Sequence, residues 1–313
     1  ERGAAGDDPG RGGLDWRPRL RPIFVSSDPR ALLPALGVTL LGQLLVVTRW
    51  TLLLAIGRCA TRWSYALRLT FLGLFFNLVV PGVTGGDVVK GALAVRDHPE
   101  RRLATFTSVV IDRAIGLLAV LALAACALAW LGPAHAAARL RPLVLGALAV
   151  ALVGFASWLF APRALVERAR RLPQGARLAP LIAAGRVHAR HPAHLGAAFA
   201  LSFANHLANA GTVYLLARGA SAQLGPAAVT AATAIGSAAA AIPLSPGGLG
   251  VLEGAIGYLF ALLGSTAALG VATALSWRLL LVALGLAGGL ALFVPGAGRR
   301  GLREQAARAA AEA

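Results

Sequence analysis

Long apolar runs alternate along the chain with short stretches rich in arginine. The runs that are long enough for a bilayer crossing occupy residues 31–57, 103–131, 142–160, 193–217 and 266–294. A helix needs about 20 consecutive, mostly apolar residues to cross the hydrocarbon core. Each of these runs therefore predicts a membrane-spanning helix, and together they predict an all-α fold.

Two further sets of apolar segments are short and are interrupted by glycine and proline. Residues 65–80 run into a Pro-Gly dipeptide, and residues 227–242 run into the stretch 243–250, whose sequence is PLSPGGLG. Residues 251–263, which follow the second break, are again a short apolar segment. Irregular backbone is tolerated in hydrocarbon only where protein or a water-filled cavity satisfies it. We therefore expect two re-entrant pairs, each of which enters the bilayer, breaks and returns to the same side.

The positions of the arginines orient the chain, because loops rich in Lys and Arg face the cytoplasm. Residues 161–192 hold seven arginines and a single acid. This segment is therefore assigned to the cytoplasm and interpreted as a basic, partly amphipathic stretch on the membrane surface. The basic stretches 58–68 and 96–102 both fall on this side if the first short pair is re-entrant, and the basic tail falls there if the second pair is re-entrant as well.

This topology divides a single membrane domain, residues 31–294, into two halves of opposite orientation. Residues 31–132 and 193–294 each contain a spanning helix, a re-entrant pair and a second spanning helix, and residues 133–192 connect them through a helix and the basic segment. The predicted fold is thus a polytopic transmembrane helical bundle with two inverted repeats. Matched breaks in two inverted halves are typical of a midplane binding site in transporters.

The two ends of the chain differ from the membrane domain. Residues 1–30 form a polar segment, and residues 295–313 form a basic tail assigned to the cytoplasm. The sequence begins with Glu1 and contains no methionine, so we expect a leading segment, such as a first helix, to be missing from it.

The composition excludes an ordinary soluble domain. Hydrophobic residues make up 57% of the 313 residues and charged residues 14%, whereas soluble domains average about 45–50% and about 25%. The net charge of +17 would suggest a nucleic-acid partner in a soluble chain. Here the arginines lie between apolar runs, so we expect cytoplasmic loops and no nucleic acid. The two cysteines, Cys59 and Cys126, support neither a disulfide framework nor a metal site.

Charged groups inside apolar runs are the main candidates for function, because each costs roughly 2.5–3.5 kcal/mol on insertion scales. Asp112, Arg113 and Arg278 lie deep in predicted spanning helices, while Asp87 and Glu253 follow the glycines of the two breaks. We expect both breaks to face one polar cavity. The candidate cavity residues are Asn77, Gly85, Gly86, Asp87, Lys90, Asp112, Arg113, Asn205, Pro246, Gly247, Gly248, Glu253 and Arg278.

Structural roles compete with each of these assignments. Adjacent side chains on a helix point in different directions, so Asp112 and Arg113 each need a partner of their own, and an interhelical ion pair is as good an explanation as a substrate role. Asp87 and Glu253 are equally well placed to cap the returning half-helices. Arg49 is expected to extend to the membrane interface.

Polar residues in the run 193–217 favour helix packing over chemistry. Asn205, His206 and Asn209 are interpreted as interhelical hydrogen-bonding groups. A single histidine does not predict a metal site, and the sequence contains no nucleophile elbow, phosphate-binding loop or zinc-protease motif. We therefore expect no catalytic residues, no cofactor and no enzymatic activity.

Three stretches resemble the transmembrane region of lysylphosphatidylglycerol synthases and their stand-alone, flippase-like relatives. They are residues 71–90 (FLGLFFNLVVPGVTGGDVVK), 108–118 (SVVIDRAIGLL) and 242–253 (IPLSPGGLGVLE). The resemblance implies a polytopic bundle that moves or accommodates a lipid between leaflets. It does not imply synthase activity, because the soluble aminoacylating domain of the bifunctional members is not in this sequence.

The leading hypothesis is a flippase-like protein of a bacterial inner membrane that moves a phospholipid or lipid-linked headgroup. Arg113, Arg278 and Lys90 would attract an anionic phosphate, and the acids would orient them or face a cationic headgroup. One alternative is an accessory subunit that presents a lipid-linked substrate to a glycosyl- or acyltransferase. Besides membrane lipids, the expected partners are a partner enzyme or further copies of the chain in a homo-oligomer. Another is a proton-coupled transporter of a small solute.

Overall fold

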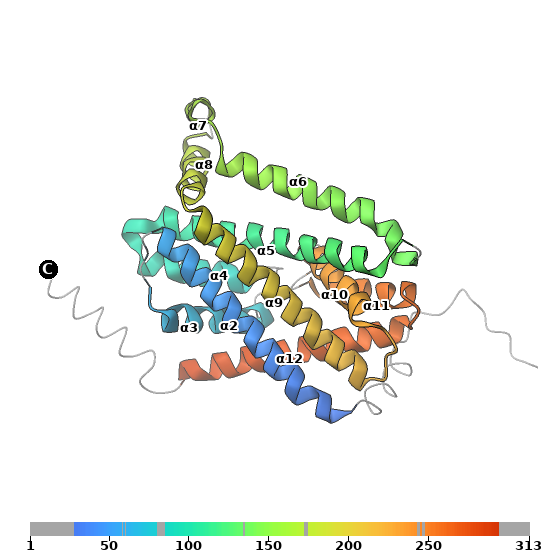
Figure 1. Cartoon of the computed structure of the whole chain (residues 1–313). Helices are drawn as coiled ribbons and strands as arrows, with labels where there is room; N and C mark the ends of the chain where they lie inside the picture. Colours follow the sequence, from blue (N-terminus) through green and yellow to red (C-terminus); the bar gives the residue numbers. More distant parts are fainter. Residues whose placement is uncertain are drawn as a thin grey trace, which may run out of the picture.

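The computed structural model describes residues 28–57, 59, 61–79, 85–133, 135–171, 175–242, 245 and 248–293. Within these ranges all regular structure is helical (Figure 1). Short 3-10 turns occur at Pro29–Ala31, Pro99–Arg101 and Ala136–Leu140.

Long helices occur where the long apolar runs predict them. They are α2 (Leu32–Ile56), α5 (Arg102–Leu131), α6 (Arg141–Leu159), α9 (Pro192–Gly219) and α12 (Ala267–Phe293). Four of them, α2, α5, α6 and α12, are long and apolar enough to cross a membrane. α9 has 28 residues and is long enough to cross a membrane, but its polar side chains make it less apolar than those four helices.

The short helices end at the predicted breaks. α3 (Trp63–Val79) packs against α4 (Gly85–Asp97), and α10 (Pro226–Ala240) packs against α11 (Val251–Leu262). α3, the longest of them, has 17 residues, which is about 25 Å at ~1.5 Å per residue, shorter than the ~30 Å hydrocarbon core. The short lengths agree with re-entrant pairs, but insertion from one side stays a prediction.

Small residues allow the helices of the two halves to approach closely. α2 packs along α9, α3 packs on α12, and α10 packs on α5 (Figure 1). A Cβ atom built on Gly288 of α12 would lie 2.8 Å from the Cβ of Phe71 on α3. Lipid tails are as apolar as the helix surfaces, so the hydrophobic effect does not drive helices together in a bilayer. Close van der Waals packing between helices contributes to their association instead.

The variant Gly288→Ala is therefore expected to destabilise the protein by about 1–3 kcal/mol, because the new methyl group has no room against the Phe71 backbone. Thermal unfolding in detergent measures the effect. Gly154→Ala on α6 is the control, since a Cβ there would meet nothing within 4 Å. Equal stability of the two variants would contradict the close packing of α3 and α12.

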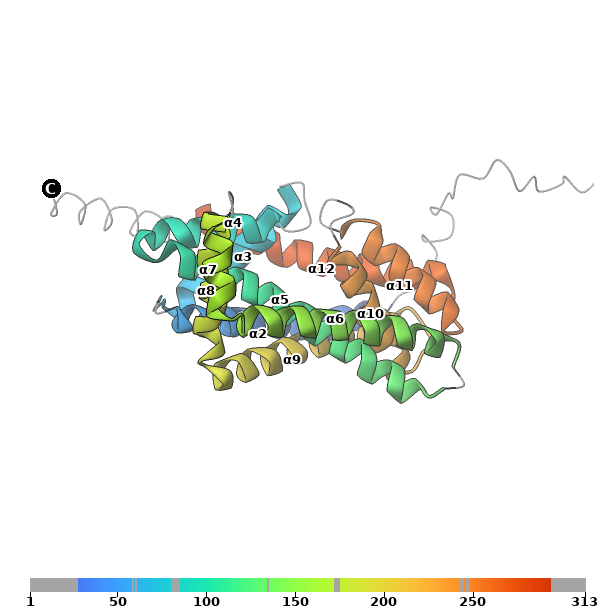
Figure 2. The same ribbon diagram turned by 90° about the horizontal axis from the view of Figure 1, so that it is seen from above.

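The connection between the halves lies at the edge of the bundle. α6 runs beside α5 (Figures 1 and 2) and leads to α7 (Arg163–Arg170) and α8 (Gly175–Ala189), which pack on each other. Trp158 Nε1 of α6 donates a hydrogen bond to the Leu181 carbonyl of α8 at 3.1 Å and so links these two helices. Burial lowers the pKa of His188 below its ordinary value, so the positive charge of the segment comes from its arginines.

The main apolar core occupies the end of the bundle opposite α7 and α8. It joins the second half of α5 to α10 and α11 and to the end of α9, through residues such as Leu128, Val213, Val229 and Phe260. Smaller clusters occupy the other end, where α2 finishes and α5 begins. One end of the bundle is therefore packed more densely than the other.

Candidate functional site

A cavity of about 630 Å³ lies between helices of the first half, α9, and the tip of the α10–α11 pair. Binding sites for small ligands commonly have about 300–1,000 Å³, so a polar headgroup would fit. The polar lining residues are Gln43, Arg49, Thr70, Asn77, Asp87, Lys90, Asp112, Arg113, Asn205, His206 and Ser237.

The cavity brings together part of the predicted site. The predicted residues that line it are Asn77, Asp87, Lys90, Asp112, Arg113 and Asn205. Gly85 and Gly86 begin α4 but are not lining residues. Pro246 and Gly247 lie outside the described residues.

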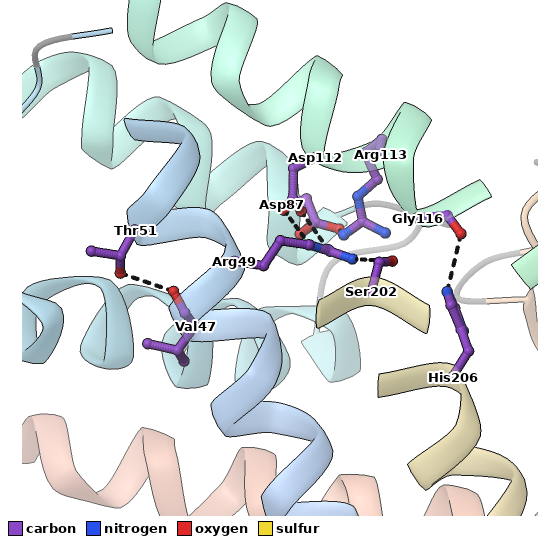
Figure 3. A network of polar contacts seen from close by, with 9 residues as sticks. All are labelled: Val47, Arg49, Thr51, Asp87, Asp112, Arg113, Gly116, Ser202 and His206. Carbon is purple, nitrogen blue, oxygen red and sulfur yellow. Dashed lines mark hydrogen bonds and ion pairs between the residues drawn. The ribbon is translucent and has the colours of Figure 1, made fainter. Parts of the chain in front are cut away.

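A buried ion pair crosses the base of the cavity. Arg49 Nε and Nη2 donate to the two carboxylate oxygens of Asp112 at 2.7 and 2.8 Å, and its Nη1 donates to the Ser202 hydroxyl at 2.7 Å (Figure 3). The Arg49 and Asp112 side chains are only 7% and 4% exposed. The expectation that Arg49 extends to the membrane interface is therefore wrong, because Asp112 and Ser202 hold it between α2, α5 and α9.

A second ion pair lies in the cavity wall, between Arg113 of α5 and Asp87 in the first turn of α4 (Figure 3). Asp112 and Arg113 thus have separate partners, as their adjacent positions predict. The Asn77 side chain accepts a hydrogen bond from the Gly86 N–H at 2.8 Å, so Asn77 satisfies one free donor at the start of α4. The Arg113 side chain is 55% exposed and lines the cavity.

Lys90 is the one cavity cation without a carboxylate partner among the described residues. Lys90 is 3% exposed, and its ammonium group lies 3.8 Å from the ring centroid of Trp50, which makes a cation–π contact. The Thr70 hydroxyl, which also lines the cavity, is buried without a hydrogen-bond partner in the described part of the chain. Lys90 is also the only lysine in the sequence.

The charges of the described lining residues do not cancel. Arg49, Lys90 and Arg113 oppose only Asp87 and Asp112, which leaves one positive charge. A buried charge without a counterion is costly, and an anionic ligand lowers that cost. The cavity therefore favours an anionic group.

α9 supplies the wall opposite Lys90. His206 Nε2 lies 3.0 Å from the Gly116 carbonyl and links α9 to α5, as expected for an interhelical contact (Figure 3). The Asn205 and Asn209 side-chain oxygens are buried and have no hydrogen-bond partner among the described residues. Both face Gly42 of α2. The described groups of His, Cys, Asp and Glu include no cluster that would hold a metal ion.

The acid–arginine pair beside the second break is separate from this cavity. Glu253 and Arg278 form an ion pair with each other, Glu253 Oε2 accepts the Gly250 N–H at 2.8 Å, and Arg278 Nη2 donates to the Gly248 carbonyl at 3.3 Å. Contrary to the prediction, none of Glu253, Arg278 and Gly248 lines the cavity. The reason is that Glu253 turns back to cap α11 and to meet α12, while the neighbouring Leu252 faces the cavity.

Nearly all of the predicted membrane domain matches one protein family. A family model described as lysylphosphatidylglycerol synthase TM region matches residues 13–289. The chain belongs to this family. Comparisons with curated proteins and with solved structures gave no match.

Membership in the lysylphosphatidylglycerol synthase TM region family and the apolar helices make the chain a multi-pass integral membrane protein. The stretches that carried the resemblance also build the cavity. Residues 71–90 supply Asn77, Asp87 and Lys90, and residues 108–118 supply the two charged residues of α5.

Sequence reasoning missed several polar lining residues, namely Gln43, Arg49, Thr70 and Ser237. Gln43 and Thr70 are isolated polar residues within apolar helices, and this isolation is the signal that could have found them. That signal does not separate a side chain that faces a cavity from one that bonds its own helix.

Proposed function

We propose that the protein binds the phosphate of an anionic lipid headgroup in this cavity and moves the lipid between leaflets, as a carrier and not as an enzyme. The observation that carries the proposal is Lys90, a buried cation without a carboxylate partner among the described residues, in a cavity with one excess positive charge. A phosphate offers the charge and the hydrogen-bond acceptors that Lys90 and the Thr70 hydroxyl lack.

The surroundings of the cavity favour a lipid over a small solute. Beside the half-exposed Arg113, Leu117 is 37% exposed on the same face of α5 and also lines the cavity. Val88, which follows Asp87, is 65% exposed, and Ile242, at the end of α10, is 54% exposed. Exposed apolar side chains beside lining residues would allow acyl chains to stay in the bilayer while the headgroup enters the cavity.

The helix arrangement supports two inverted halves with re-entrant pairs. α3 contacts α12 in the same way as α10 contacts α5, which is the exchange expected if a pseudo-twofold axis relates the halves. In the proposed orientation the basic side, with α7 and α8, faces the cytoplasm, in keeping with the positive-inside rule, and the proposed membrane is a bacterial inner membrane.

Lipid movement in proteoliposomes tests the proposal. An acyl-labelled fluorescent phosphatidylglycerol is equilibrated between leaflets, and its exposure to dithionite outside is followed. Lys90→Gln is expected to slow the movement at least about tenfold, equal to ~1.4 kcal/mol, because the phosphate loses its counterion. Arg102→Gln, at an exposed position at the start of α5, is the control and is expected to leave the rate unchanged.

Equal rates for Lys90→Gln and the parent protein would overturn the role of Lys90. Because Lys90 is the only lysine in the sequence, its reaction with an amine-specific reagent gives a second readout by mass spectrometry. Phosphatidylglycerol should protect Lys90, whereas phosphatidylcholine should protect it less. Protection without lipid movement would favour the alternative, an accessory subunit that holds a lipid-linked substrate for a partner enzyme.

A further inference from the structure

The two acid–arginine pairs occupy equivalent positions in the two halves. Asp87 is the third residue of α4 and Glu253 the third residue of α11. Their partners, Arg113 and Arg278, are each the twelfth residue of the long helix that follows, α5 and α12. Each pair therefore joins the returning short helix of its half to the next long helix.

Further residues agree in the same register. Thr70 and Thr233 are the eighth residues of α3 and α10, and Gly73 and Gly236 are the eleventh. In α4 and α11 the seventh residue is glycine in both helices. The agreement extends over the last three helices of each half without a gap inside any helix, so it does not rest on the ion pairs alone.

The environments of the two pairs differ although their positions match. The Asp87 and Arg113 side chains are 17% and 55% exposed, and both residues line the cavity. The Glu253 and Arg278 side chains are 6% and 22% exposed, and neither residue lines it. The tip of the α10–α11 pair forms the cavity wall, so it separates the second pair from the cavity.

We propose that Glu253 and Arg278 form a second headgroup station, the counterpart of Asp87 and Arg113, and that the two stations alternate in lining the cavity. The proposal rests on the lipid-binding function proposed above. The structure shows the first station open and the second closed against the main apolar core. In the opposite state the halves exchange these environments, and the phosphate passes from Arg113 to Arg278.

The stations are not chemically equal. The position that corresponds to Lys90, the sixth residue of α4, is Ile256 in α11. Ile256 is fully buried and apolar. The second station therefore has an arginine but no additional cation, and it is expected to hold an anionic headgroup more weakly than the first.

Cysteine reactivity at these two matched positions tests the alternation. The native Cys59 and Cys126 are first replaced by serine, and single cysteines are introduced by Lys90→Cys or Ile256→Cys. Reaction with a membrane-impermeant thiol reagent is measured in proteoliposomes of phosphatidylglycerol and phosphatidylcholine. With the native ion pairs, the cysteine at position 90 is expected to react at least about fivefold faster than the one at 256.

Removal of the second pair by Glu253→Gln is expected to shift the two rates in opposite directions, with a rise at 256 and a fall at 90. Glu253→Asp, which keeps the carboxylate, should retain the native pattern. A rise at 256 without a fall at 90 would overturn alternation, since it indicates local loosening only. Should Glu253→Gln fail to fold, Arg278→Gln makes the same test from the other partner.

This experiment does not depend on lipid movement. Transfer is measured separately in protein that keeps Lys90. Opposite shifts in reactivity without measurable transfer by that protein would support the two stations and count against translocation. If lipid transfer persists but Glu253→Gln does not shift the reaction rates at 90 and 256 in opposite directions, translocation is supported and the second station is overturned.

Discussion

The variant Asp112→Asn is expected to lower the free energy of unfolding by about 3–5 kcal/mol, because it leaves the Arg49 guanidinium buried without its counterion. Arg49 is 6% exposed, and its contacts join three helices through Asp112 and Ser202. The loss therefore acts on the packing of α2, α5 and α9 together. Thermal unfolding in detergent, followed by tryptophan fluorescence, measures it.

Two further variants make the result specific. The double variant Arg49→Met/Asp112→Leu should recover most of the lost stability, because well-packed apolar residues can replace a buried ion pair at little or no cost. Arg96→Gln is the matched surface control. Arg96 Nε lies 3.7 Å from a carboxylate oxygen of Asp97, and the Arg96 side chain is 67% exposed. Exposed ion pairs contribute only about 0–1 kcal/mol to stability. Equal stability of Asp112→Asn and Arg96→Gln would refute a structural role for the buried pair.

The variant Ala241→Trp is expected to reduce lipid movement to the rate of protein-free vesicles. Ala241 is the C-cap residue that follows α10, is exposed and lines the cavity, so an indole there occupies the space that the headgroup needs. The change lies outside the apolar core, and thermal stability should stay close to that of the parent protein. The measurement is dithionite accessibility of labelled phosphatidylglycerol in proteoliposomes.

Ala149→Trp on the exposed face of α6 is the control for the added bulk. It lies away from the cavity lining and is expected to leave the rate unchanged. Lipid movement at the parental rate in Ala241→Trp would show that the cavity is not the route.

The helices could be predicted closely from the sequence. The apolar run 103–131 became α5 (Arg102–Leu131), and the short segment 251–263 became α11 (Val251–Leu262). The agreement has a simple cause. In a membrane protein the length of an apolar run is set by the bilayer, and arginine, glycine or proline marks each end.

The contacts of the site could not be predicted in the same way. A helix that is apolar all round gives no amphipathic signal for the face it presents to its neighbours. Arg49 was therefore assigned to the interface, although Asp112, on another helix, holds it in the interior. Glu253 was placed correctly at a break, but the sequence did not show that its side chain turns toward Arg278.

The uncompensated charge of Lys90 makes the empty and the occupied protein electrically different under the proposed function. A singly charged phosphodiester cancels the excess, so the occupied cavity is neutral. The empty cavity keeps one positive charge, and a transmembrane potential exerts about 2.3 kcal/mol per charge moved across 100 mV. Because the phosphate leaves Lys90 when it passes to Arg278, voltage would act on this step as on a single moving negative charge.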